Sequence, residues 1–188
     1  MVTFSMKPVL LDNIFSPREL FFMYAQITGT PHWALDGASG NGISDFRRGP
    51  MLEVKKIEGE VLNYPFYLYG QSIVFRIAHL LEQKKIGIPT KLIRMWFNIT
   101  NSGEKSQHWL HTDQECFKTK SIVLFLTPLW QPDWRGSFYV DGEEFKFKPG
   151  SAVIFDANTY HQGEDVISQT YNWQRLTANI LVKNYADV

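Results

Sequence analysis

The chain has few of the features that mark secreted, membrane-bound or nucleic-acid-binding proteins. Cys116 is its one cysteine, so no internal disulfide can form and nothing calls for an oxidising compartment. Nineteen basic residues balance nineteen acidic ones, so the broad positive field that attracts nucleic acid or anionic lipid is missing. No run reaches the ~18 apolar residues of a membrane span, and the first residues do not resemble a secretory signal. We expect a cytoplasmic protein that binds neither nucleic acid nor membrane.

The chain does have enough apolar and aromatic residues to form a core. It contains 188 residues, of which 44% are hydrophobic and 15% aromatic, a size suited to one domain. It has no internal repeat, and no linker long enough to separate two domains. We therefore predict a single domain over residues 1–188, in which residues 1–90 supply helical support and flexible loops and residues 91–182 form a β core.

Two helices are predicted before residue 90. At the start of the first, Ser16 can cap, Pro17 suits the first helical position and Glu19 can complete a capping box. An apolar stripe at helical spacing follows. The second helix is indicated by apolar residues between Ile73 and Leu81, and it should end at residues 84–87. Residues 37–42 and 47–50 are predicted to be flexible loops, and the glycine order in the first does not fit a dinucleotide-binding turn.

The second half of the chain indicates short strands separated by turns. The Asp141-Gly142 pair is typical of a two-residue hairpin, and alternating residues follow it. Eight candidate strands in residues 91–182 give about 11.5 residues per strand with its turn, within the ~8–12 typical of a sandwich or barrel. We predict an α+β fold whose jelly-roll core has N-terminal helices packed against it. The candidate strands are residues 92–98, 108–112, 121–127, 137–140, 143–147, 152–155, 160–163 and 175–182.

Three residues form a candidate metal site. His111 and Asp113 are two positions apart, so on a strand both would point to one side. His161 follows fifty residues later, and two histidines with one carboxylate form the facial triad that holds non-haem Fe(II). His108 is at an odd spacing from His111 and is left out of the site. His79 is expected on a helix surface, and His32 has no partner.

Arg175, fourteen residues after His161, is a candidate carboxylate receptor. It opens a predicted strand on which Thr177 and Asn179 share its face. A guanidinium can bind both oxygens of a carboxylate, and a neighbouring hydroxyl can add a hydrogen bond. The alternative for Arg175 is a surface ion pair.

Residues 92–182 resemble the 2-oxoglutarate- and Fe(II)-dependent dioxygenases, most closely the prolyl 4-hydroxylase-like branch. Five stretches match in the family's order and cover about half the chain. They are His111-Thr112-Asp113; Phe125-Leu126-Thr127-Pro128-Leu129-Trp130 with Trp134-Arg135-Gly136; Lys148-Pro149-Gly150-Ser151-Ala152-Val153-Ile154-Phe155-Asp156; His161; and Arg175-Leu176-Thr177.

The resemblance implies a double-stranded β-helix with assigned site residues. Iron would be held by His111, Asp113 and His161, and the far carboxylate of 2-oxoglutarate by Arg175 helped by Thr177. The implied activity is hydroxylation of a C–H bond with O2, releasing succinate and CO2. Because the family's carboxylate ligand is kept, halogenation is disfavoured.

The chain departs from the family pattern at two positions. Phe125 stands where relatives often have a tyrosine that reaches the cosubstrate, and Arg135-Gly136 replaces the usual Gly-Gly. Asn98 either supplies the missing polar contact or serves in a turn at the end of its strand. These departures leave the substrate open between a peptide or protein side chain and a small molecule.

Two other functions remain open at this point. A cupin-like jelly-roll enzyme would use similar metal ligands but does not need Arg175 and Thr177. A non-catalytic binding domain could keep the fold without responding to Fe(II) and 2-oxoglutarate. In an oxygenase, residues 37–42 and 47–50 would be candidates for a lid that closes over the site. The sequence does not determine the oligomeric state.

Overall fold

The structure, a computed structural model, describes residues 6–29, 34–35, 46–53, 64–88, 90–100, 110–113, 118–167 and 173–183. In these residues, two α-helices accompany ten strands that form two antiparallel sheets. The large sheet has seven strands in the order β1-β8-β5-β10-β4-β3-β2, and the small sheet has three in the order β7-β6-β9. The elements are β1 (Val9–Leu11), α1 (Pro17–Thr28), β2 (Ala34–Leu35), β3 (Phe46–Glu53), α2 (Tyr64–Glu82), β4 (Lys91–Thr100), β5 (Thr119–Phe125), a 3-10 turn (Pro132–Trp134), β6 (Phe138–Val140), β7 (Glu143–Phe145), β8 (Ala152–Asp156), β9 (His161–Gly163) and β10 (Arg175–Lys183).

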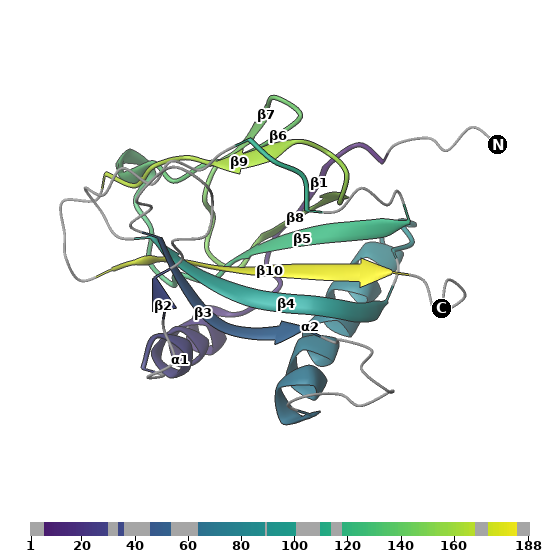
Figure 1. Cartoon of the computed structure of the whole chain (residues 1–188), viewed down its shortest axis with the longest axis horizontal. Helices are drawn as coiled ribbons and strands as arrows, with labels where there is room; N and C mark the ends of the chain where they lie inside the picture. The colour runs from purple at the N-terminus through teal and green to yellow at the C-terminus, as the bar shows by residue number, and fades with distance from the viewer. Residues whose placement is uncertain are drawn as a thin grey trace.

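The two faces of the large sheet have different partners. Figure 1 shows α1 and α2 on one side of it and the small sheet on the other. Because side chains alternate along a strand, each strand contributes one set of residues to each side. The helix-side core combines residues such as Leu20 and Ile77 with Phe97, Leu124 and Ala178. Between the sheets lies a second core of Val123, Phe125, Phe138, Val140, Phe145, Phe147, Val153 and Phe155.

Helix α1 begins as predicted. The Ser16 hydroxyl accepts a hydrogen bond from the Glu19 backbone N–H, and the Glu19 carboxylate accepts one from the Ser16 N–H, so the capping box is confirmed. Glu19 also pairs with Arg76 of α2, with Nη1 and Oε1 2.7 Å apart. This contact and the cap lower the pKa of Glu19 to about 2. The first helix is therefore tied to the second.

Helix α2 begins nine residues before the predicted Ile73. Its early turns contain Gly70, which is a poor helix former. A Cβ at Gly70 would lie 2.9 Å from Leu92 Cδ2 and 2.9 Å from Met95 Sδ, so the helix packs closely on β4 there. This packing outweighs the unfavourable local propensity, which explains why the sequence pattern placed the start too late.

The prediction that the β structure begins at residue 91 is wrong. Strands β1, β2 and β3 precede it and join the large sheet. Residues 47–50, expected in a loop, lie in β3, and the pairing of β3 with β4 shifts register between Arg48 and Met51. A register shift accommodates Gly49 and Pro50, because proline cannot donate to a regular ladder. That residues 1–188 form one domain stays a prediction.

The strands predicted after residue 118 are confirmed, with ends that differ by up to two residues. Of the candidate strand 108–112, residues 108–109 lie outside the described residues, and in the described part His111 forms an isolated bridge with His161 instead of a strand. Residues 37–42 also lie outside the described residues. Among the described residues, no helix is both long and apolar enough to cross a membrane.

The capping box gives a testable prediction for stability. Replacing Ser16 by alanine removes the hydroxyl that accepts from the Glu19 N–H, which should lower the free energy of unfolding by about 1 kcal/mol. Urea denaturation followed by circular dichroism measures this change. Ser72→Ala is the matched control, because the Ser72 hydroxyl donates only to Tyr69 O one turn earlier in α2. Equal stability losses in both variants would contradict a specific capping role.

Candidate active site

Two segments fifty residues apart meet at His111 and His161. The His111 N–H donates to His161 O at 3.1 Å, and the His161 N–H donates to His111 O at 2.9 Å. Such a reciprocal antiparallel pair places both side chains on the same side of the backbone. The ring centroids are 4.3 Å apart. The two imidazoles are therefore neighbours because the backbone pairs them.

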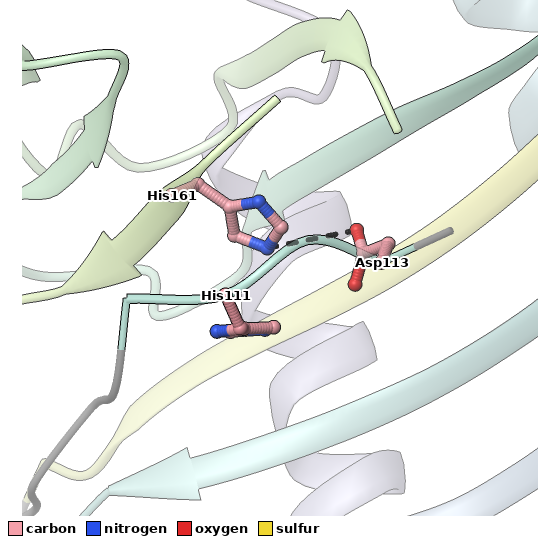
Figure 2. A group of neighbouring side chains, drawn as sticks. All are labelled: His111, Asp113 and His161. Atoms are coloured by element: carbon pink, nitrogen blue, oxygen red, sulfur yellow. Dashed lines mark ion pairs between the residues drawn. The ribbon is translucent and has the colours of Figure 1, made fainter. Parts of the chain in front are cut away.

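Asp113 completes the cluster from the same segment as His111. Its N–H donates to Ala157 O at 2.9 Å, which anchors the segment to the end of β8. Its Oδ2 lies 3.7 Å from His161 Nε2. One candidate ligand atom from each of the three residues lies within 4.8 Å of the others. Figure 2 shows the side chains of His111, Asp113 and His161 close together. The structure thus brings together the three residues that the sequence predicted as metal ligands.

The environment of His161 prepares one ring nitrogen for a metal. Its Nδ1 lies 3.0 Å from Thr159 O, and since a carbonyl only accepts, Nδ1 carries the proton. The lone pair is then on Nε2, the atom that faces Asp113. The ring packs against Phe138 and Phe155. Burial lowers the pKa of His161 below its ordinary 6.5, although Asp113 opposes the shift. The neutral form, which binds metals, is therefore favoured.

Arg175 is buried at the start of β10, so the surface ion pair considered above is excluded. Its Nη1 makes one long contact of 3.5 Å to Glu164 O, and its Nε has no hydrogen-bond partner among the described residues. Burial lowers its pKa to about 10, with Glu164 and Asp165 opposing the shift, so the guanidinium stays charged at neutral pH. A buried cation with an unused donor is costly unless an acceptor is supplied.

Thr177 is flanked by two other candidate cosubstrate residues. In the sheet it is the Cα partner of Asn98 in β4 and of Phe125 in β5, so the three side chains share one face. Asn98 lies within β4, so the alternative of a turn residue is wrong. Asn98 Oδ1 is buried and has no partner among the described residues. Phe125 stacks on Phe147, with ring centroids 4.7 Å apart.

The other histidines fall outside this cluster. His79 is exposed on α2, where its Nε2 lies 3.2 Å from Gln83 Nε2, as expected for a helix-surface residue. His32 and His108 lie outside the described residues.

Two hydroxyl residues at the site were missed by the sequence reasoning. Ser121 Oγ donates to Asp113 Oδ2 at 2.6 Å, and Thr127 Oγ1 donates to Gln174 O at 2.8 Å beside Arg175. The available signal was their position at either end of the apolar run Ile122-Val123-Leu124-Phe125-Leu126. A hydroxyl in such a run needs a partner when buried.

Comparison with solved structures identifies the fold. No protein-family model and no curated protein matches the sequence. A Pseudomonas putida prolyl-4-hydroxylase matches with a TM-score of 0.62 and 14% identity, over 94% of this chain and 92% of its own. The α-ketoglutarate-dependent carbocyclase SnoK from nogalamycin biosynthesis matches with 0.63 and 13%, over 94% and 79%. HygX from Streptomyces hygroscopicus, solved with nickel and 2-oxoglutarate, matches with 0.55 and 8%, over 95% and 83%.

These similarities confirm the predicted fold class. The chain has the double-stranded β-helix fold of the 2-oxoglutarate- and Fe(II)-dependent oxygenases, with helices packed on the large sheet. Within that fold, its own residues offer two nitrogens and a carboxylate at one point and a buried guanidinium at the start of β10 in the large sheet. The donor set fits a divalent metal ion with open coordination positions, and Arg175 Nε fits a carboxylate.

The cluster predicts which residues control metal binding. Asp113→Ala removes the one carboxylate of the set and should weaken Fe(II) binding at least tenfold, because neutral imidazoles alone leave the ion's charge uncompensated. Anaerobic equilibrium dialysis with Fe(II) measures the loss. His79→Ala, which changes an exposed helix residue, and His108→Ala should both leave the iron stoichiometry intact. The assignment of Asp113 as a metal ligand would be contradicted if Asp113→Ala bound Fe(II) normally while His79→Ala or His108→Ala lost it.

Proposed function

We propose that this protein is a 2-oxoglutarate- and Fe(II)-dependent dioxygenase that hydroxylates a C–H bond of a peptide or small-molecule substrate. The observation that carries the proposal is the convergence of His111, Asp113 and His161, with ligand atoms within 4.8 Å. Two histidines and a carboxylate on one side of a metal leave coordination positions open for cosubstrate and O2. Fe(II) with bound 2-oxoglutarate supplies O2-dependent decarboxylation to succinate and CO2, coupled to oxidation of the substrate.

The protein's own residues have distinct roles in this scheme. Asp113 supplies the negative charge for the metal, and His161 supplies Nε2 because Thr159 O fixes the proton on Nδ1. Arg175 pairs with the far carboxylate of 2-oxoglutarate, which would give its Nε the partner it lacks among the described residues. Thr177 adds a hydroxyl on the same face of β10. Aromatic residues between the sheets, including Phe125 and Phe155, help to exclude water.

Asn98 is the residue that we assign to the polar contact that Phe125 cannot make. Both side chains flank Thr177 on one face of the sheet, and Phe125 has no hydrogen-bonding atom. The oxygen and nitrogen of an asparagine amide can exchange places by rotation, so Asn98 can present a donor to a carboxylate.

The neighbours with this fold differ in what they do to their substrates. Besides the prolyl-4-hydroxylase they include the carbocyclase SnoK and the epimerase SnoN, and a Trichoplax adhaerens prolyl hydroxylase was solved with a peptide fragment. Hydroxylation is proposed for this chain because it keeps the carboxylate ligand and resembles the prolyl 4-hydroxylase-like branch. A cytoplasmic location belongs to the same proposal, since Cys116 calls for no oxidising compartment.

Binding of both cofactors tests the proposal directly. Anaerobic addition of Fe(II) and then 2-oxoglutarate should produce the weak visible charge-transfer band of the chelated complex, and admitting O2 should yield succinate. A cupin-like enzyme would bind the metal without this band. A non-catalytic domain would give neither the band nor succinate. Either of these results would overturn the proposal.

Cosubstrate binding should depend on Arg175 separately from metal binding. Arg175→Gln removes the charged partner of a buried carboxylate, a loss that typically costs about 2–5 kcal/mol, so 2-oxoglutarate affinity should fall roughly 30-fold or more. Fe(II) should still bind. Titration with 2-oxoglutarate at saturating Fe(II) measures the change. Parent-like affinity would place the carboxylate receptor elsewhere.

Thr177→Val should have a smaller effect on the same titration. It removes one neutral hydrogen bond worth about 1 kcal/mol, so affinity should fall about fivefold. A loss as large as that of Arg175→Gln would contradict the assigned order of importance, in which the guanidinium dominates.

A further inference from the structure

We propose that two buried hydroxyls at the two ends of one segment are positioning residues, Ser121 for the metal-binding carboxylate and Thr127 for the cosubstrate arginine. The inference rests on the proposed function. Neither hydroxyl belongs to a proposed metal ligand or to a proposed contact of the cosubstrate, and we expect that metal binding and cosubstrate binding can be weakened independently.

Ser121 donates a hydrogen bond to the carboxylate of Asp113. Its Oγ lies 2.6 Å from Asp113 Oδ2, and both side chains are almost fully buried. In the sheet, the cross-strand partners of Ser121 are Leu181 and Phe155, so its neighbours in the large sheet are apolar. A hydroxyl among apolar side chains is destabilising unless it is hydrogen-bonded, and Asp113 is the partner it has.

This hydrogen bond is important because it acts on the carboxylate itself, which the backbone contact of Asp113 does not orient. The Asp113 N–H donates to Ala157 O, and two side-chain torsions separate this anchored backbone from the carboxylate. Donation from Ser121 fixes one orientation, in which Oδ2 lies 3.7 Å from His161 Nε2. Hydrogen bonds to ligating carboxylates orient metal sites, and their removal typically costs about 10–100-fold in metal affinity.

Thr127 acts on Arg175 through the backbone at both sides of it. The backbone pairing between β5 and β10 ends at Phe125 and Thr177. Beyond this point, the Thr127 hydroxyl makes hydrogen bonds to the backbone of the chain on either side of Arg175. Thr127 Oγ1 donates to Gln174 O at 2.8 Å and accepts from the Leu176 N–H at 2.8 Å. The residues before and after Arg175 are thus attached to a single fully buried hydroxyl.

Tyr24 of α1 also contacts the backbone just before Arg175, at Gln174. Its hydroxyl accepts a hydrogen bond of 3.0 Å from the Gln174 N–H, and its ring contacts Trp173. With Thr127, this contact fixes the direction in which β10 begins. The side chain of Arg175 also packs closely against Gly136, where an added Cβ would lie 3.2 Å from Arg175 Cδ. The guanidinium is therefore positioned before any ligand arrives, which lowers the ordering cost of binding.

The experiment compares Ser121→Ala with Thr127→Val in two titrations. Mn(II), a redox-stable substitute for Fe(II), measures metal affinity by electron paramagnetic resonance, and 2-oxoglutarate at saturating Mn(II) measures cosubstrate affinity. Ser121→Ala should weaken Mn(II) about tenfold or more and 2-oxoglutarate less than about twofold. Thr127→Val should weaken 2-oxoglutarate about fivefold and leave Mn(II) affinity unchanged.

Conservative variants separate positioning from a merely structural role. Ser121→Thr and Thr127→Ser keep the hydroxyls and should restore the respective affinities, with thermal unfolding midpoints recorded for all variants. Should Thr127→Val fail to fold, Tyr24→Phe removes the hydroxyl that accepts from the Gln174 N–H and should weaken 2-oxoglutarate binding but not Mn(II) binding.

Three results would overturn the inference. One is an equal loss of both affinities in each variant; another is a lowered unfolding midpoint with parent-like affinities; the third is a hydroxyl-retaining variant that binds no better than its hydroxyl-free counterpart. Failure of the unmodified protein to bind Mn(II) and 2-oxoglutarate would instead overturn the proposed function, and this inference with it.

Discussion

The antiparallel register of β5, β10 and β4 is the constraint on which the rest of the site depends. Side chains alternate along each strand, so the pairing of Thr177 with Phe125 and Asn98 decides which residues face the small sheet. A slip by one residue would turn Arg175 and Thr177 toward the helices and Leu176 and Ala178 toward the site. The helix-side core prevents this slip, because it would then have to bury a guanidinium among apolar residues.

The two faces of the large sheet divide stability and chemistry between them. The helix side is almost entirely apolar and is tied together by contacts such as Gly70 of α2 on β4. The opposite side carries buried polar groups that are poorly satisfied by the described residues, notably Arg175 Nε and Asn98 Oδ1. Unsatisfied polar groups of this kind are tolerated at functional sites because the remaining packing over-determines the fold.

Charge at the site is divided between two positions that serve different ligands. Asp113 supplies a carboxylate beside His161, whose pKa burial lowers, and this pair suits a cation. Arg175 is positive and desolvated at the start of β10 in the large sheet, which suits an anion. Under the proposed function, a metal ion together with an anionic cosubstrate would give both positions a partner.

The sequence by itself determined the local features: the capping box at Ser16, the alternating strands, and the residue types His111, Asp113, His161 and Arg175. These depend on periodicity and short-range geometry, which neighbouring residues specify. Only the tertiary structure decided that β3 continues through Gly49 and Pro50, that α2 starts at Tyr64, and that Ser121 and Thr127 support the site. Thr127 reaches a residue 47 positions away, and no local pattern specifies such a partner, because chain folding and side-chain packing choose it.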